Sequence, residues 1–162
     1  MNHTWKLCLL LILLLAVMTA IFAFSSQPAA QSQKLSDSLL DRVGKLLGFL
    51  PWFREDPGKK IRKLAHFTEF MCLGMVSELF FHELCLAKKN RLSTGTVCSL
   101  LFCFLYACSD EIHQIFVPGR SCEWKDVLLD SAGAVIGLAI SFLIVFMLDR
   151  KAGHAENEDT SA

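Results

Sequence analysis

Residues 110–130 read DEIHQIFVPGRSCEWKDVLLD, and this stretch decides how the rest of the chain is arranged. Pro118 and Gly119 favour a sharp turn at its middle. The residues on either side of the stretch are strongly apolar, so the turn joins two long hydrophobic segments. Ionisable groups that enter lipid cost about 2.5–3.5 kcal/mol each on insertion scales, and they are rare there without partners or a function. The stretch therefore predicts two membrane helices with a polar site where they meet.

The composition extends this prediction to the whole chain. Of the 162 residues 53% are hydrophobic, the formal net charge is zero, and the mean hydropathy is +0.43, too high for an ordinary soluble domain. A membrane-spanning helix needs about 20 mainly apolar residues. Four segments meet or nearly meet this length, namely 7–24, 61–86, 96–116 and 124–148. The balanced charge gives no support for nucleic-acid binding.

We therefore predict an all-α fold, a polytopic bundle of four transmembrane helices in a single domain over residues 1–150. The short polar segment 151–162 is expected to be a disordered tail. The first apolar segment can also be interpreted as a secretory signal, because Ala23-Phe24-Ser25 is a passable cleavage site. Its apolar core is longer than a usual signal core, which favours a retained span.

A further helix is predicted over residues 35–50. Leucine and valine recur there at helical spacing, with charged residues elsewhere around the helix, and Pro51 ends the pattern. We predict that this amphipathic helix lies at the membrane surface, which is the simplest interpretation of the pattern. It can equally pack on the bundle.

Alternation of four spans brings the polar residues to one side of the membrane. At 1.5 Å per residue, Asp110 and Asp130 each lie roughly 9 Å inside the ends of their spans. We expect the carboxylates and His113 of the 110–130 stretch to face the second span. The candidate catalytic groups of this layer are His66, Glu69, Asp110, Glu111, His113, Gln114, Asp126 and Asp130.

The spacing within the fourth span indicates that its acidic face is also its packing face. Asp126, Asp130, Gly133 and Gly137 follow i, i+4, i+7 and i+11. The two glycines form a small-residue seam where helices can approach closely. The charged residues can simply pair with one another and fix the helix arrangement. Their number favours a functional site.

Arg120 is the first candidate for ligand binding. Its planar guanidinium suits a phosphate or carboxylate, and the neighbouring Gly119 lets the backbone approach. The depth of the polar layer matches lipid headgroups, so an amphiphile with an anionic head is the expected ligand. The other predicted ligand-binding residues are Arg62, Lys63, Ser26 and Gln27. Histidine and carboxylates can also bind a metal, but no His-x-x-x-His pair is present, so we predict neither a metal nor another cofactor.

At these motifs the chain resembles the VanZ-like family of bacterial integral membrane proteins. The matching elements are Phe24-Ser25-Ser26-Gln27, Arg62-Lys63-x-x-His66-Phe67-x-Glu69-Phe70, Asp110-Glu111-x-His113-Gln114-x-Phe116-x-Pro118-Gly119-Arg120, and Asp126-x-x-x-Asp130-x-x-Gly133-x-x-x-Gly137. Phe70 stands where such proteins often have tyrosine. The resemblance covers nearly the whole chain up to about residue 148.

The resemblance implies a multi-pass protein of the bacterial cell membrane. The family's name comes from teicoplanin-type glycopeptide resistance clusters of Gram-positive bacteria, and the family has no settled catalytic activity. The resemblance also implies cytoplasmic N- and C-termini, with the motif side facing outward. The distribution of Lys and Arg does not decide the orientation.

Three functions follow from these observations. The first is a non-enzymatic protein of the cell envelope that contributes to teicoplanin-type resistance by binding a lipid-linked cell-wall intermediate or a lipoglycopeptide drug, with membrane lipids as partners. The second is a membrane enzyme that acts on a phospholipid or polyprenyl headgroup. The third is a small proton-coupled exporter, which the shallow placement of the carboxylates disfavours. The oligomeric state is not predicted.

Overall fold

The computed structural model describes residues 3–47, 56–88 and 92–159, and these residues form five helices and no strand. In chain order the helices are α1 (His3–Ser25), α2 (Ala29–Leu47), α3 (Pro57–Ala87), α4 (Leu92–Gln114) and α5 (Trp124–Asp159). The predicted all-α fold is confirmed.

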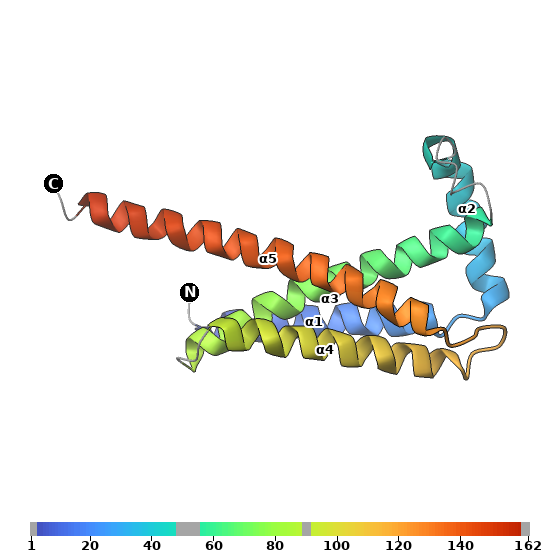
Figure 1. The fold of residues 1–162 in the computed structure, drawn as a ribbon, viewed down its shortest axis with the longest axis horizontal. Helices are drawn as coiled ribbons and strands as arrows, with labels where there is room; N and C mark the ends of the chain where they lie inside the picture. Colours follow the sequence, from blue (N-terminus) through green and yellow to red (C-terminus); the bar gives the residue numbers. More distant parts are fainter. Residues whose placement is uncertain (1–2, 48–55, 89–91, 160–162) are drawn as a thin grey trace.

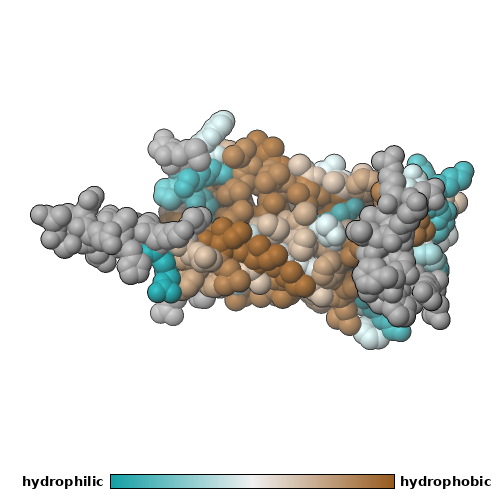
Figure 2. All heavy atoms as spheres, turned by 90° about the horizontal axis from the view of Figure 1, so that it is seen from above, coloured by the Kyte–Doolittle hydropathy of each residue, from teal (hydrophilic) through white to brown (hydrophobic). Residues whose placement is uncertain are grey.

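Four of the five helices, α1, α3, α4 and α5, are long and apolar enough to cross a membrane. Their outer surfaces carry large apolar side chains, such as Ile12 and Leu105, each 65% exposed. Figure 2 shows an apolar band between hydrophilic groups at both ends of the molecule. Exposed apolar surface of this extent is typical of a protein in contact with lipid. The protein is therefore a multi-pass membrane protein.

The helix α3 is the centre of the bundle. It packs most extensively against α5, and it also contacts α4, α1 and α2. Figure 1 shows both chain termini at the end of the molecule where α3 is followed by α4. The end of α1, the start of α3, the end of α4 and the start of α5 lie at the opposite end, as alternation of four spans predicts.

The contact between α3 and α5 depends on glycines. A Cβ atom added at Gly137 would overlap the carbonyl oxygen of Met71, and one added at Gly133 would overlap that of Phe67. Ser141 lies one turn after Gly137 and donates a hydrogen bond to the carbonyl oxygen of Met75 (3.1 Å). The predicted small-residue seam is thus confirmed, and it continues one turn further.

The apolar core lies in the middle of the bundle. Ile21 of α1, Phe70 and Leu73 of α3, and Ala107 of α4 are completely buried. Tyr106 lies at the edge of this core, where its hydroxyl donates to the carbonyl oxygen of Met18 (2.7 Å). A hydroxyl in an apolar bundle needs such a partner.

The helix α2 begins at Ala29, six residues before the predicted start, and positions 48–50 of the prediction lie outside the described residues. Ser32 and Ser36 are buried, whereas Leu35 and Leu39 are 47% and 41% exposed. Because α2 also contacts α3, it packs on the bundle through a face of small polar residues. Packing on the bundle is thus confirmed for α2, and its position on the membrane surface stays a prediction.

The limits of α3 and α5 have local causes. Asp56 precedes α3 as its N-cap and accepts a hydrogen bond from the Lys59 backbone (3.4 Å), and Pro57 occupies the first helical position. The helix α5 continues to Asp159, whereas we expected a disordered tail from residue 151. The residues after Arg150 are mostly good helix formers that continue an existing helix, which polar composition alone does not reveal.

Candidate functional site

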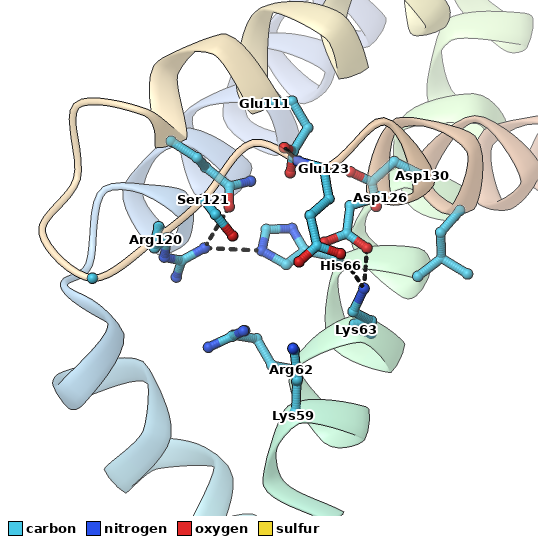
Figure 3. A pocket seen from close by; sticks show the side chains of 13 residues that line it. Lys59, Arg62, Lys63, His66, Glu111, Arg120, Ser121, Glu123, Asp126 and Asp130 are labelled. Atoms are coloured by element: carbon cyan, nitrogen blue, oxygen red, sulfur yellow. Dashed lines mark hydrogen bonds and ion pairs between the residues drawn. The ribbon is translucent and has the colours of Figure 1, made fainter. Parts of the chain in front are cut away.

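A polar cavity of about 140 Å³ lies at the end of the bundle where α3 and α5 begin and α4 ends. Figure 3 shows its side chains converging from α3, α5 and the loop between α4 and α5. The lining residues are Lys59, Arg62, Lys63, His66, Glu111, Gln114, Gly119, Arg120, Ser121, Glu123, Asp126, Leu129 and Asp130. The cavity thus combines cationic and acidic groups from elements that are distant in the sequence.

The turn at Pro118 and Gly119 positions Arg120. The Arg120 backbone N–H donates to the carbonyl oxygen of Val117 (3.1 Å), and Gly119 has a φ of +77°. Proline followed by a residue with positive φ is the pattern of a type II turn, which favours glycine at that position. The carbonyl oxygen of Pro118 accepts from the N–H of Ala29 (3.1 Å), so the turn is also attached to the start of α2.

The guanidinium of Arg120 joins four parts of the chain. Nε donates to the carbonyl oxygen of Gln27 (3.1 Å) and Nη2 to that of Phe24 (3.1 Å). Nη1 donates to Oε1 of Gln114 (3.2 Å) and lies 3.4 Å from Nε2 of His66. Cations are favourable near the carbonyl end of a helix, here that of α1. Much of the predicted ligand-binding capacity of Arg120 is therefore used to attach the connection after α1.

The charged state of Arg120 survives this partial burial. Burial lowers the pKa of the guanidinium from its usual value, and the nearby positive charge of Arg62 lowers this pKa further, while Asp110 raises it. Arginine starts from so high a pKa that it stays protonated in proteins. The cavity therefore keeps a fixed positive charge on its loop side.

Asp110 lies behind the cavity wall and is only 3% exposed. Its Oδ2 accepts hydrogen bonds from Oγ of Ser25 (2.8 Å) and from Nε2 of Gln114 (2.9 Å). Its Oδ1 is buried without a hydrogen-bond partner among the described residues. The carboxylate is thus fixed in orientation by one oxygen while the other remains unsatisfied.

The start of α5 is held to α3 and α4 by polar contacts. Lys63 forms an ion pair with Asp126, and its Nζ lies 3.8 Å from Oε2 of Glu123. Glu111 is 2% exposed, and its Oε2 accepts from the Glu123 backbone N–H (2.9 Å). These contacts support the structural interpretation of the polar layer for Lys63, Glu111 and Asp126, since each has a partner within the protein.

His66 lies between the two sides of the layer. Its Nδ1 is 3.5 Å from Oε2 of Glu69, one turn later on α3, and neither atom has a hydrogen-bond partner within the part of the chain that the structure describes. Glu69 does not line the main cavity; it lines a smaller adjoining space beneath α2 that shares Arg62, His66 and Arg120 with the cavity. The imidazole of His66 is therefore in contact with both the main cavity and the smaller space.

The third span does not present His113 to this cluster. His113 Nε2 lies 3.0 Å from Oγ of Ser26, and its ring stacks on Phe22 at a centroid distance of 4.5 Å. His113 therefore lies against α1 instead of facing His66 and Glu69. Our expectation that it faces the second span was wrong, because the tertiary packing of α4 against α1 places the ring against Ser26 and Phe22.

An apolar groove of about 360 Å³ adjoins the cavity. It lies on α3 and α5 and is lined by Lys60, Lys63, Leu64, Phe67 and Leu129. Lys63 and Leu129 line both the groove and the cavity. The polar cavity and the apolar groove on the side of the bundle are thus contiguous.

The family model described as VanZ/LLP1 matches residues 10–146. The chain belongs to the VanZ-like family. No match was found among curated proteins or among solved structures. In this VanZ-like protein the matched region includes all of α3 and α4, most of the apolar parts of α1 and α5, and every residue of the cavity.

The cavity of the VanZ-like protein contains most of the candidate residues that the sequence indicated. It collects His66, Glu111, Gln114, Asp126 and Asp130, together with the predicted ligand-binding residues Arg62, Lys63 and Arg120. Ser26 lies with His113 outside it. Gln27 lines the adjoining space and contributes its backbone carbonyl to Arg120.

The cavity also contains four residues that were not predicted as site residues, namely Lys59, Ser121, Glu123 and Leu129. Lys59 had a signal, because Lys59, Arg62, Lys63 and His66 follow i, i+3, i+4 and i+7 on one helical face. The loop residues Ser121 and Glu123 had no such sequence signal, since a loop side chain is placed by tertiary contacts and not by a helical period.

Proposed function

We propose that this VanZ-like protein binds the anionic headgroup of a membrane amphiphile in the polar cavity, with the apolar chain of the ligand in the adjoining groove. The observation that carries the proposal is the shared wall of the two spaces, formed by Lys63 and Leu129. A lipid has the same pairing of a charged head and an apolar chain. Lateral entry from the bilayer then needs no opening of the bundle.

The cationic side chains of the cavity differ in whether they already have partners within the protein. Lys63 and Arg120 are occupied by Asp126 and by backbone carbonyls, respectively. The side chains of Lys59 and Arg62 make no hydrogen bond or ion pair with any residue that the structure describes, and both line the cavity. Figure 3 shows both on the α3 side of the cavity. We assign the headgroup contacts to this pair.

The size of the cavity favours a headgroup over a complete drug. Sites for drug-sized ligands typically have about 300–1,000 Å³, whereas the polar cavity has about 140 Å³. A phosphate or pyrophosphate group of a lipid-linked cell-wall intermediate is of the right scale. A contribution to teicoplanin resistance then acts through the lipid-linked precursor and not through capture of the drug.

Binding of defined lipids tests the proposal. Full-length protein in neutral detergent is titrated with phosphatidylglycerol, a polyprenyl phosphate and phosphatidylcholine, and bound lipid is counted by native mass spectrometry. We expect preference for the anionic lipids and a loss of roughly ten- to 150-fold in affinity in Arg62→Ala, since a charge-assisted hydrogen bond contributes about 1.5–3 kcal/mol.

The matched control is Lys125→Ala. Lys125 is an exposed residue at the start of α5, at the same end of the bundle, and does not line the cavity. Equal losses in Lys125→Ala and Arg62→Ala mean that only the general surface charge matters, and they refute the assignment. For the resistance role, teicoplanin susceptibility is compared in a strain that lacks the gene and in strains complemented with wild type or Arg62→Ala. Identical susceptibility in all of them excludes that role.

An enzyme acting on the same headgroup is the second candidate, and the position of His66 favours it. The histidine lines the cavity beside Asp130 and has Glu69 at 3.5 Å, as a positioned acid or base requires. Purified protein incubated with phosphorus-labelled lipids should then release product, and His66→Gln should abolish the release. If the protein binds the labelled lipids but converts none of them, the enzymatic function is refuted and the non-enzymatic binding function is retained.

A further inference from the structure

Three metal-ligand side chains from three helices meet at the inner end of the cavity. They are His66 of α3, Asp110 of α4 and Asp130 of α5, and one ligand atom of each lies within 4.8 Å of the other two. A first-row divalent ion holds nitrogen and oxygen ligands at about 2.1 Å, and so roughly 3–4 Å from one another. Shifts of about 1 Å in the side-chain ligand atoms would therefore bring all three to binding distance from one ion.

Asp110 gives an independent indication of a ligand. Its Oδ2 is held by Ser25 and Gln114, while its Oδ1 is buried and has no hydrogen-bond partner among the described residues. A buried carboxylate oxygen without a partner is costly and needs an explanation. Hydrogen bonds to the first oxygen that fix the direction of the second are the usual support of a metal-binding carboxylate.

The charge around this point also favours a cation. Asp110, Glu111 and Asp130 are each 2–3% exposed, and Glu69 lies beside His66. Arg120 bonds to Gln114 and approaches His66, but it forms no ion pair with these carboxylates in the part of the chain that the structure describes. Lys63 is paired with Asp126 nearer the mouth. Buried carboxylates that outnumber their cations require protons or a bound ion.

We propose that His66, Asp110 and Asp130 form a divalent-cation site at the inner end of the cavity. One imidazole and two carboxylates suit zinc, manganese or ferrous iron better than they suit a soft ion. His66 and Asp130 line the cavity, so the bound ion has an open side toward it. A water molecule or a phosphate oxygen completes the coordination. The site goes beyond headgroup binding and does not depend on it.

The experiment measures binding of Mn²⁺ and Zn²⁺ to the full-length protein in detergent, purified without a histidine tag and stripped with a chelator. Metal content after re-equilibration gives the stoichiometry, and electron paramagnetic resonance of Mn²⁺ gives the affinity. We expect one ion per chain and an affinity about tenfold or more weaker in Asp130→Asn and in His66→Gln. Glu83→Gln is the matched control, since Glu83 is a buried acid that bonds to His3 in another part of the bundle.

Two results overturn the site. One is a wild-type protein that binds neither ion; the carboxylates are then balanced by protons. The other is that Asp130→Asn and His66→Gln bind the metal with the same affinity as wild type or as the control Glu83→Gln. The ion is then bound elsewhere in the protein. Should Asp130→Asn fail to fold, the more exposed His66→Gln decides. Lipid titrations repeated with the chelator separate this proposal from headgroup binding, because lipid that binds equally without metal leaves the proposed function intact.

Discussion

The close contact between α3 and α5 leads to a quantitative prediction for Gly137→Ala. The new Cβ would overlap the carbonyl oxygen of Met71 and approach the backbone nitrogen of Met75. Backbone atoms cannot rotate away, so the helices must separate. Overpacking of this kind costs about 1–3 kcal/mol, whereas alanine gains about 1 kcal/mol over glycine in helix propensity. The net change in the free energy of unfolding is a loss of roughly 0–2 kcal/mol.

Gly95→Ala is the comparison that removes the propensity term. Gly95 also lies in a helix, but its added Cβ would stand 3.1 Å from the nearest atom, the carbonyl oxygen of Phe81, a tight contact without overlap. We expect Gly137→Ala to be less stable than Gly95→Ala by about 1–3 kcal/mol. Unfolding by sodium dodecyl sulfate in mixed micelles, followed by circular dichroism, measures both. Equal stabilities would show that the glycine seam does not set the helix distance.

Three further predictions concern single side chains. Tyr106→Phe removes the hydrogen bond to the Met18 carbonyl and should lower the free energy of unfolding by about 0.6 kcal/mol, with an upper limit of about 1.7 kcal/mol, in the same assay; no change means that the carbonyl finds another partner. Arg120→Lys should speed hydrogen exchange at the end of α1, because lysine cannot bond to both carbonyls; unchanged exchange with weaker lipid binding would instead make Arg120 a ligand group. If the cavity faces outward, exposed Cys122, kept as the sole cysteine, should react with a membrane-impermeant maleimide in intact cells; labelling only after lysis reverses the orientation.

Much of the fold was predictable because lipid limits the choices. A segment that crosses the membrane must satisfy its backbone internally, so hydropathy alone located the four spans. The alternation of spans then fixed which ends share a side. The spacing of Asp130, Gly133 and Gly137 predicted correctly that one face of α5 is polar at its start and closely packed further along.

The rotation of α4 about its own axis was not predictable. Asp110 and His113 are separated by one helical turn, and both are polar, so the pattern does not state which of them faces α3. The structure turns Asp110 toward Ser25 and the cluster, and His113 toward Ser26 and Phe22. The difference arises from tertiary packing, which no period in a single helix encodes.

The same limit applies to the proposed metal site. Its three ligands come from three helices, one from each, so no spacing within a helix reveals them. Because the sequence contains no His-x-x-x-His pair, it did not predict a metal site. Only the helix arrangement brings the imidazole and the two carboxylates within reach of one ion.

The position of the glycine seam has a consequence for how the cavity keeps its shape. Asp130 precedes Gly133 by about one turn of α5, and His66 precedes Phe67, whose carbonyl oxygen meets Gly133. The backbone contact of α3 with α5 thus lies directly beneath the cavity and sets the distance between His66 and Asp130. Removing a rim cation such as Arg62 should therefore weaken ligand binding while leaving stability unchanged. Separating the helices at Gly133 should weaken both, because the same contact supports the fold and aligns the site.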